Sequence, residues 1–308
     1  MLKHAWWPHS PCGPGCLGGQ EPTVGRIRRV LRITALVTVV FFSLLSVILL
    51  PVIGRRGRNW LTRAIFRSVL LAVGVKLVVH GTIPGPGRGA LVVNNHTSWL
   101  DIVAVNAVRP MRAVAKKDIA SWPVLGWLVS AAGSIYVDRE NIRSLSGTVT
   151  TLADSLRAGS MVNVTPEGTT WCGLTHGRFR PALFQAAIDG GVPVLPVALR
   201  FRLRGGDRTT APAFIGDETI VDSVRRTAAL RGLVLEVHVR DEIAPGRAQD
   251  RRELASLAER AVDDVLMPAS LPAEKHAWAA GVWTDEHEDS CARNEPRNLR
   301  AQEGRRRV

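Results

Sequence analysis

The hydrophobic pattern divides the chain into an apolar N-terminal part and a longer part with alternating apolar runs. An uncharged run from Ile33 to Ile53 is long enough to cross a hydrocarbon core of about 30 Å. A second apolar stretch, 64–79, is interrupted by Arg67 and Lys76, which favours a helix lying in the membrane interface. Arginines flank the first run on both sides, so the positive-inside rule gives no orientation. These patterns favour a re-entrant or interfacial pair of helices over a single membrane span.

From about Gly81 to Met267, short apolar runs alternate with longer amphipathic ones, which is typical of an α/β domain. The expected strands are 90–94, 112–115, 134–137, 161–165, 194–200 and 233–239. The expected helices are 99–107, 119–131, 142–157, 181–189 and 250–266. We therefore predict a central, mostly parallel or mixed sheet flanked by helices and preceded by N-terminal membrane-associated helices.

The same pattern predicts four regions along the chain. Residues 1–25 form a disordered leader, and residues 26–79 form a membrane-associated helical region. Residues 80–268 form the folded domain, and residues 269–308 form a flexible basic tail because they are polar and rich in arginine. Val24, directly before the basic flank, is an equally sensible start of translation.

The charge balance predicts an anionic partner. The chain has 308 residues, a formal net charge of +13, a sequence pI of about 10.9 and 46% hydrophobic residues. Such a balance favours nucleic acid or an anionic membrane surface. The chain has one Tyr and no Phe or Tyr interleaved with a basic patch as stacking surfaces require, which argues against nucleic acid. Because the arginines flank the apolar segment and fill the tail, the membrane surface is the better partner.

The cysteines predict neither a disulfide framework nor a metal site; they are Cys12, Cys16, Cys172 and Cys291. His4 and His9 with the first two cysteines would supply metal-ligating atoms, but their spacing matches no common zinc pattern. Their segment is also rich in Gly and Pro, which favours an unstructured leader. The folded part is therefore expected to be a reduced domain on the cytoplasmic side.

The first candidate for chemistry is the pair His96 and Asp101, directly after the strand expected at 90–94. A histidine titrates near neutral pH and accepts a proton from a hydroxyl, while a carboxylate holds its ring. On one straight helix, side chains five residues apart diverge by about 140°, so the pair meets only if His96 ends the strand and Asp101 lies in the first helical turn. Ser98 and Asp101 have the spacing of a capping box, which supports a helix starting at Ser98. The alternative is that Asp101 only caps this helix and His96 is an ordinary loop residue.

Three further segments also lie next to expected strands: 133–139, which ends in Asp138-Arg139, 164–170 with Pro166-Glu167-Gly168, and 191–198 with two prolines. Taken singly, they are consistent with a solvated ion pair, an ordinary turn and an edge-strand device. In α/β sheets, ligands gather at the carboxyl ends of strands. His96, Arg139 and Glu167 all fall at such ends.

In order, these segments resemble the four motifs of the glycerolipid acyltransferases, and most closely the 1-acyl-sn-glycerol-3-phosphate acyltransferase branch. The resemblance covers about residues 80–240. It is carried by Asn95-His96-x-Ser98-x-x-Asp101, Gly133…Asp138-Arg139, Pro166-Glu167-Gly168-Thr169 and Val192-Pro193-x-x-Pro196-Val197. It implies a membrane-associated O-acyltransferase of phospholipid biosynthesis that converts lysophosphatidic acid to phosphatidic acid.

The resemblance also implies the roles of these residues. His96 acts as general base on the free hydroxyl of a lysolipid, and Asp101 orients its ring. The hydroxyl then attacks the thioester of acyl-CoA or acyl carrier protein, with no metal and no cofactor. Arg139 helps to bind a phosphate, and the prolines of the fourth motif shape the wall near the acyl donor. The substrate-binding set is Ser98, Arg139, Glu167, Gly168, Thr169 and Pro196.

The implied partners are a lysolipid acceptor, the acyl donor and an anionic membrane surface, with no nucleic acid. The implied location is the cytoplasmic face of the cell membrane, held by the N-terminal helical region.

The third motif departs from the family pattern of Phe before the Pro-Glu-Gly-Thr run, with Arg and often Ser after it. Those positions are Thr165, Thr170 and Trp171 here. Loss of the arginine removes a phosphate ligand, a charge-assisted contact worth about 1.5–3 kcal/mol. Candidates to replace it are Arg178, Arg180 and Arg200. Alternatively, the acceptor is another lysolipid, such as a lyso-ornithine lipid or a lysophospholipid with a larger headgroup. His176 matches no family role.

Three other classes of protein are compatible with parts of the sequence. A non-catalytic membrane lipid-binding protein would need no base paired with a carboxylate, which argues against that class. A hydrolase of the Gly-x-Ser-x-Gly type is disfavoured because that segment is absent from the sequence. A nucleic-acid binder would explain the charge but neither the apolar segment nor the four motifs.

Overall fold

A computed structural model describes residues 10–49, 52–85, 87–122, 125–138, 141–206 and 208–266. Its centre is a seven-stranded sheet with the order β1-β7-β6-β2-β5-β3-β4. The strands are β1 (Lys76–His80), β2 (Ala90–Asn94), β3 (Arg112–Lys116), β4 (Ile135–Val137), β5 (Met161–Val164), β6 (Val194–Leu203) and β7 (Leu233–Val239). All neighbouring pairs are parallel except β6 and β7, which are antiparallel. The predicted α/β class with a mixed sheet is confirmed.

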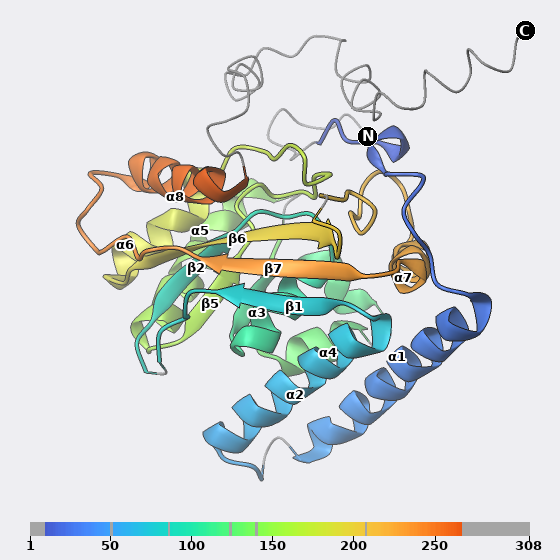
Figure 1. The fold of residues 1–308 in the computed structure, drawn as a ribbon. Coiled ribbons are helices and arrows are strands. Elements are labelled where there is room, and N and C mark those ends of the chain that lie inside the picture. Colours follow the sequence, from blue (N-terminus) through green and yellow to red (C-terminus); the bar gives the residue numbers. More distant parts are fainter. Residues whose placement is uncertain are drawn as a thin grey trace, which may run out of the picture.

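Helices cover both faces of this sheet (Figure 1). They are α1 (Arg26–Ser46), α2 (Arg55–Val73), α3 (Leu100–Val108), α4 (Leu125–Ala131), α5 (Leu145–Arg157), α6 (Gln185–Gly190), α7 (Ile220–Ala229) and α8 (Arg251–Leu266). On one face, α2 and α3 bury a core against β6 and β7 that includes Leu70, Leu100 and Leu199. On the other face, α5, α6 and α8 bury Leu156 and Leu254 against β2 and β5. The central strands β2 and β5 are therefore buried, so the ends of the strands are where a site can reach the surface.

The N-terminal region is a pair of packed helices, α1 and α2, at one side of the sheet domain (Figure 1). Among the described helices, α1 alone is long and apolar enough to cross a membrane, by length and composition, and little of it is buried. The pair ends at Gly74, which adopts φ 79° and stops α2. The expectation that the membrane-associated region continues to residue 79 is corrected, because Lys76–His80 forms the edge strand β1 beside β7.

Two of the helices differ from the prediction. The helix expected at 119–131 is divided into a 3-10 turn at Lys117–Ser121 and α4. Trp122 between them has extended backbone, as favoured before Pro123. The helix α7 was not predicted; Thr219 caps it by accepting the backbone N–H of Asp222.

Residues 10–25 do not form the expected disordered leader. Cys12 is buried with Trp171, Cys172, Ala213 and Ile215 in a small apolar cluster. The backbone N–H of Gly18 donates to Thr210 Oγ1 at 2.9 Å. The N–H of Val24 donates to the carbonyl of Ala229, and the N–H of Arg231 donates to the carbonyl of Pro22. Tertiary contacts thus order a Gly- and Pro-rich segment that has little regular structure of its own. Residues 1–9 and the expected tail at 269–308 lie outside the described residues.

Candidate active site

The loop between β2 and α3 brings His96 and Asp101 together. Just before it, the side chain of Asn95 bonds the backbone of Leu199 in both directions, at 3.0 and 2.8 Å, which fixes the end of β2 against β6. His96 follows at the carboxyl end of the strand, and its Nδ1 lies 2.9 Å from Asp101 Oδ2. The predicted strand-to-helix turn is therefore the arrangement that lets this pair meet.

Asp101 both holds the histidine ring and caps the helix. Its Oδ2 accepts the backbone N–H groups of Thr97 at 2.6 Å and Ser98 at 2.8 Å, in addition to His96. The two roles considered from the sequence are thus combined in one carboxylate, which is 1% exposed. The helix itself begins at Leu100 rather than at Ser98, and Ser98 Oγ lies 3.4 Å from the N–H of Leu100.

This geometry leaves one ring nitrogen available for chemistry. A proton on His96 Nδ1 is favoured because Asp101 accepts it, so Nε2 keeps its lone pair. The His96 side chain is 26% exposed, whereas Asp101 is fully enclosed. An exposed acceptor backed by a buried carboxylate is the arrangement required of a general base.

The third motif clamps the backbone of His96 from both sides. Glu167 Oε2 accepts the N–H of His96 at 2.8 Å, and the carbonyl of His96 accepts the N–H of Trp171 at 2.8 Å. The turn between them uses Gly168 at φ 78°, a conformation that favours glycine. Burial raises the pKa of Glu167 well above its usual range, against the opposing effects of His176 and the His96 N–H. The first and third motifs are thus one unit in space.

Several of the predicted substrate-binding residues are buried or half-buried in this structure. Ser98 and Glu167 are buried, at 0% and 3% exposure, and Thr169 is half-buried. Pro196 is buried in β6 opposite Val93. Contacts of these residues with substrate stay predictions. Arg139 lies outside the described residues.

The departures in the third motif point inward. Thr170 Oγ1 donates to the carbonyl of Phe214, and Trp171 is buried. Neither side chain takes the place of a phosphate-binding arginine.

The candidate replacement arginines differ in their surroundings. Arg200 donates twice to Glu236 Oε2, at 2.9 and 2.7 Å, and shares this carboxylate with Arg202, so one net positive charge remains on the three groups. Although burial opposes ionisation, the hydrogen bonds from Arg202 and Arg200 lower the pKa of Glu236 to about 2. Arg180 is joined to the third motif, since its backbone N–H donates to the Pro166 carbonyl at 3.1 Å. Arg178 is exposed nearby in the chain.

A half-buried ion pair close to the third motif was not predicted. His176 Nε2 lies 2.6 Å from Asp263 Oδ1 of α8, and the His176 side chain is 10% exposed. Burial opposes the charged form of His176, but the hydrogen bond and charge of Asp263, with the charge of Glu167, raise its pKa to about 9. One turn earlier on α8, Glu259 Oε2 accepts the N–H of Phe179 at 3.1 Å. The four-residue spacing of Glu259 and Asp263 was the available signal, because it places both on one helix face.

A cavity in the described part of the chain lies away from His96. Its volume is about 680 Å³, and it lies at the other end of α3, between Arg63 and Arg67 of α2 and Arg109. The assignment of the site therefore comes from the hydrogen-bond geometry of the loop rather than from a cavity.

Comparisons with known proteins agree with this geometry. An acyltransferase family model matches residues 76–200. The chain is 34% identical over 211 residues to a 1-acyl-sn-glycerol-3-phosphate acyltransferase of Neisseria gonorrhoeae, covering 68% of this chain and 82% of that protein. It is 33% identical over 225 residues to a lyso-ornithine lipid O-acyltransferase of Pseudomonas aeruginosa, covering 73% and 83%. The crystal structure of the 1-acyl-sn-glycerophosphate (LPA) acyltransferase PlsC from Thermotoga maritima has the same fold, with a TM-score of 0.60 at 17% identity, covering 84% of this chain and 97% of that one.

Proposed function

This chain belongs to the acyltransferase family, and we propose that it acylates the free hydroxyl of 1-acylglycerol-3-phosphate to give phosphatidic acid. An enzyme of the lysolipid acyltransferase type is supported by the relatives named above. Beyond this enzyme type, we propose the identity of the acceptor headgroup, acyl-CoA or acyl carrier protein as the donor, and a membrane surface as the place of the reaction. The observation that carries it is the 2.9 Å contact between His96 Nδ1 and a buried Asp101 carboxylate.

The proposed reaction is a direct transfer. His96 Nε2 accepts the proton of the lysolipid hydroxyl while the hydroxyl oxygen forms a bond to the thioester carbonyl carbon. The tetrahedral intermediate then breaks its carbon–sulfur bond, and the thiolate that leaves takes the proton from His96. Asp101 stabilises the imidazolium of His96 that exists between these two proton transfers. Glu167 and Trp171 hold the backbone of His96 in place. No acyl-enzyme is required.

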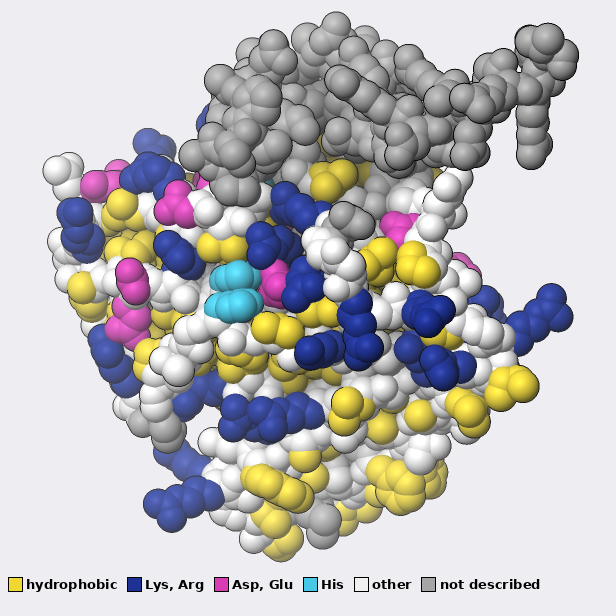
Figure 2. Space-filling model, in the orientation of Figure 1, with side chains coloured by type: hydrophobic (Ala, Val, Ile, Leu, Met, Phe, Trp, Pro, Cys, Tyr) yellow, Lys and Arg dark blue, Asp and Glu magenta, His cyan; other side chains and the backbone are white. Residues whose placement is uncertain are grey.

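The N-terminal helices are suited to supply a substrate that resides in the bilayer. Phe41 and Phe42 of α1 are 55% and 61% exposed, and Trp60 of α2 is 72% exposed. Hydrophobic side chains gather over α1 and α2 at the lower end of the molecule, with Lys and Arg side chains above them (Figure 2). An apolar surface bordered by cations matches an anionic bilayer surface. We place this surface on the cytoplasmic leaflet, where the acyl donors are made available.

A lyso-ornithine lipid is the second candidate acceptor. Thr170 stands where the family pattern has an arginine, and its hydroxyl is used on the Phe214 carbonyl. An acceptor without a terminal phosphate would not need that arginine. The relative from Pseudomonas aeruginosa carries that activity in its name and is nearly as similar as the first relative.

Acyl transfer by the purified protein in vesicles tests the proposal. Labelled acyl-CoA or acyl carrier protein is offered with a panel that includes lysophosphatidic acid, lyso-ornithine lipid and lysophospholipids with larger headgroups. We expect transfer mainly to lysophosphatidic acid and loss of turnover in His96→Ala, with vesicle binding unchanged. His80→Ala, at a histidine stacked on His238 away from this loop, is the matched control. Preferred transfer to another lysolipid would overturn the acceptor, and full activity of His96→Ala would overturn the mechanism.

A further inference from the structure

The cavity of about 680 Å³ lies at the amino ends of the central strands, away from His96. Its walls come from the first half of α2, from β1 and the turn after it, and from the end of α3. His96 follows the carboxyl end of β2, whereas Arg109 of the cavity precedes β3, and both strands run parallel to β5. The nine residues of α3, about 13 Å of helix, therefore separate the cavity from the catalytic loop.

Three arginines line this cavity. Arg63 and Arg67 lie four positions apart on one face of α2, and Arg109 directly follows α3. The Nε atoms of Arg63 and Arg67 both donate to the carbonyl of Ala107, at 3.3 and 3.1 Å. This carbonyl belongs to the last turn of α3, which has no helical donor for it. Sharing one acceptor fixes the two guanidinium groups close together, and these bonds do not use their Nη atoms.

The positive charge in this cavity is not balanced by the described residues. None of the described residues that line the cavity is acidic. The ion pairs of the described residues involve other arginines, namely Arg88, Arg157, Arg200, Arg202, Arg225 and Arg226. Burial and the neighbouring charge of Arg63 lower the pKa of Arg109. The cations therefore repel one another here, and a bound anion would relieve that repulsion.

Much of the remaining wall is apolar and continues into the exposed face of α2. Leu77 and Val79 line the cavity from one face of β1, two positions apart. The turn after β1 requires Gly81, because it has φ 84° and a Cβ there would lie 2.8 Å from the Val239 carbonyl oxygen. Trp60 is 72% exposed and belongs both to the cavity and to the apolar surface over α1 and α2. The cavity therefore lies beside the surface that would enter the bilayer.

We propose that this cavity binds the phosphate group of an anionic phospholipid of the bilayer. The guanidinium groups of Arg63, Arg67 and Arg109 hold the phosphate oxygens, since a guanidinium pairs with phosphate through two parallel hydrogen bonds. The glycerol and first methylene groups of the lipid pack against Leu77 and Trp60. Free phosphate has no apolar part to bury, so the apolar wall favours a lipid. The site rests on the membrane contact proposed above for α1 and α2, and adds to it a defined headgroup position.

The place of the site indicates what the lipid does. The lipid would hold α2 and the end of α3 at the bilayer surface, while α3 begins at the catalytic loop. It would thus set the orientation of the sheet domain on the membrane. It is not the acceptor of the acyl group, because His96 lies beyond the other end of α3.

Calorimetric binding of dihexanoyl phosphatidylglycerol, a short-chain anionic phospholipid, to the full chain in a neutral detergent tests the proposal. We expect saturable binding that is weakened about tenfold or more in Arg109→Gln, because the substitution removes a charge-assisted contact. Combining Arg63→Gln, Arg67→Gln and Arg109→Gln should abolish binding. No saturable binding by the unchanged chain would overturn the site.

The matched control replaces Arg55, Arg56 and Arg58 together with Gln. These three arginines are exposed on the same helix and do not line the cavity. The control variant loses the same charge as the triple cavity variant, and we expect it to bind the lipid as the unchanged chain does. Equal weakening in the two triple variants would mean diffuse attraction to positive charge and would overturn the site.

Two further ligands identify what is bound. Inorganic phosphate should bind much more weakly than the lipid, and equal affinity would overturn the assignment to a phospholipid. Dihexanoyl phosphatidylcholine has the same acyl chains but no net charge, and it should also bind more weakly. Equal affinity for phosphatidylcholine would overturn the selection for an anionic headgroup.

A measurement on the unchanged chain covers variants that fail to fold. Phenylglyoxal modifies accessible guanidinium groups, and peptide mass spectrometry locates the modified arginines. Phosphatidylglycerol should protect the exposed Arg63 and Arg67 but not the exposed Arg58. Equal protection of all three arginines, or of none, would contradict the site. Because lipid binding needs no acyl transfer, His96→Ala should bind the lipid normally, and failure of the proposed function would leave this result unaffected.

Discussion

Replacement of Asp101 by Asn separates orientation of His96 from helix capping. The amide oxygen of Asn can occupy the position of Oδ2 and still accept the N–H groups of Thr97 and Ser98. The negative charge that stabilises the imidazolium is lost. The substitution therefore preserves most of the loop geometry while it removes the electrostatic contribution to catalysis.

The hydrogen bonds to Asp101 set the expected magnitudes. A hydrogen bond to a charged group contributes about 1.5–3 kcal/mol and a neutral one about 0.5–1.5, so three weakened bonds reduce stability by about 3 kcal/mol. Relief of the buried charge offsets part of this loss. Loss of effective general-base catalysis lowers kcat by about 10²–10⁴-fold. Asp101→Ala would leave three buried or half-buried donors unpaired, so we expect that variant to fold poorly.

The assay measures kcat per folded molecule together with denaturant unfolding of the same preparation. Asp154→Asn, at an exposed aspartate paired with Arg157, is the matched control for loss of one negative charge. We expect a folded Asp101→Asn variant with a much reduced rate. A variant with lowered stability but a rate within about threefold of the parent, well below the loss expected of a general base, would mean that Asp101 is only a cap.

Three further predictions concern the ion pair of His176, the binding of the acceptor headgroup and the membrane contact. The charged form of His176 is stabilised in the folded protein by Asp263. The contribution of this ion pair to stability is therefore complete below pH 6.5 and lost above pH 9. Raising the pH from 6.5 through 9 should reduce the free energy of unfolding by about 3 kcal/mol. Denaturant unfolding of His176→Gln should lack most of this dependence, and an unchanged pH profile in that variant would refute the ion pair. Arg139→Ala should raise KM for a phosphate-bearing acceptor more than for the acyl donor; equal increases for both would remove Arg139 from headgroup binding. Replacing Phe41 and Phe42 together by Ser should weaken sedimentation with anionic vesicles by about tenfold or more, since each exposed ring that enters the bilayer contributes on the order of 1–2 kcal/mol; unchanged sedimentation would show that α1 is not the membrane contact.

Local pattern was sufficient for most of the fold. Alternating apolar runs located every strand from β2 to β7 within a few residues, because side-chain periodicity is a property of adjacent positions. The edge strand β1 was missed because its residues follow α2 as a continuous apolar stretch, and only pairing with β7 distinguishes it. The ordered structure of residues 10–25 was not predicted for a related reason. This segment is held by tertiary contacts such as that of Gly18 with Thr210, which its own composition does not indicate.

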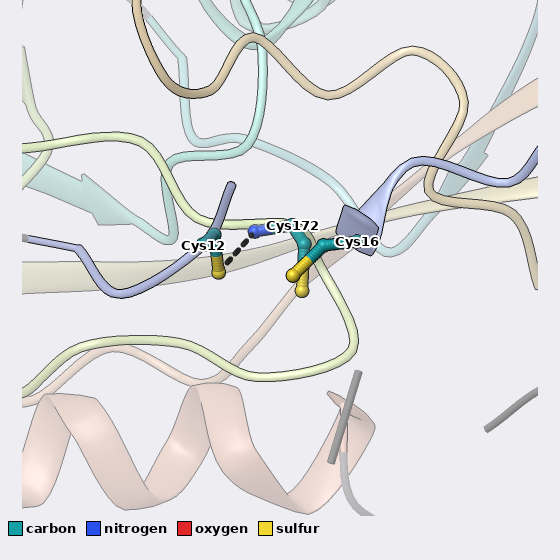
Figure 3. Close-up of side chains that lie close together, drawn as sticks. All are labelled: Cys12, Cys16 and Cys172. Carbon is teal, nitrogen blue, oxygen red and sulfur yellow. Dashed lines mark hydrogen bonds between the residues drawn. The ribbon is translucent and has the colours of Figure 1, made fainter. Parts of the chain in front are cut away.

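The sequence by itself determined the chemistry that is encoded at short range. Five positions separate His96 from Asp101, and a strand end followed by a helical turn is sufficient to join them. Only the tertiary structure decided the contacts between distant segments, such as Glu167 with the N–H of His96 across 71 positions and Cys172 with Cys12 across 160 (Figure 3). Those contacts depend on the order of the strands and on where each loop leaves the sheet. Such long-range order is set by packing of the whole domain, so no local pattern of residues carries it.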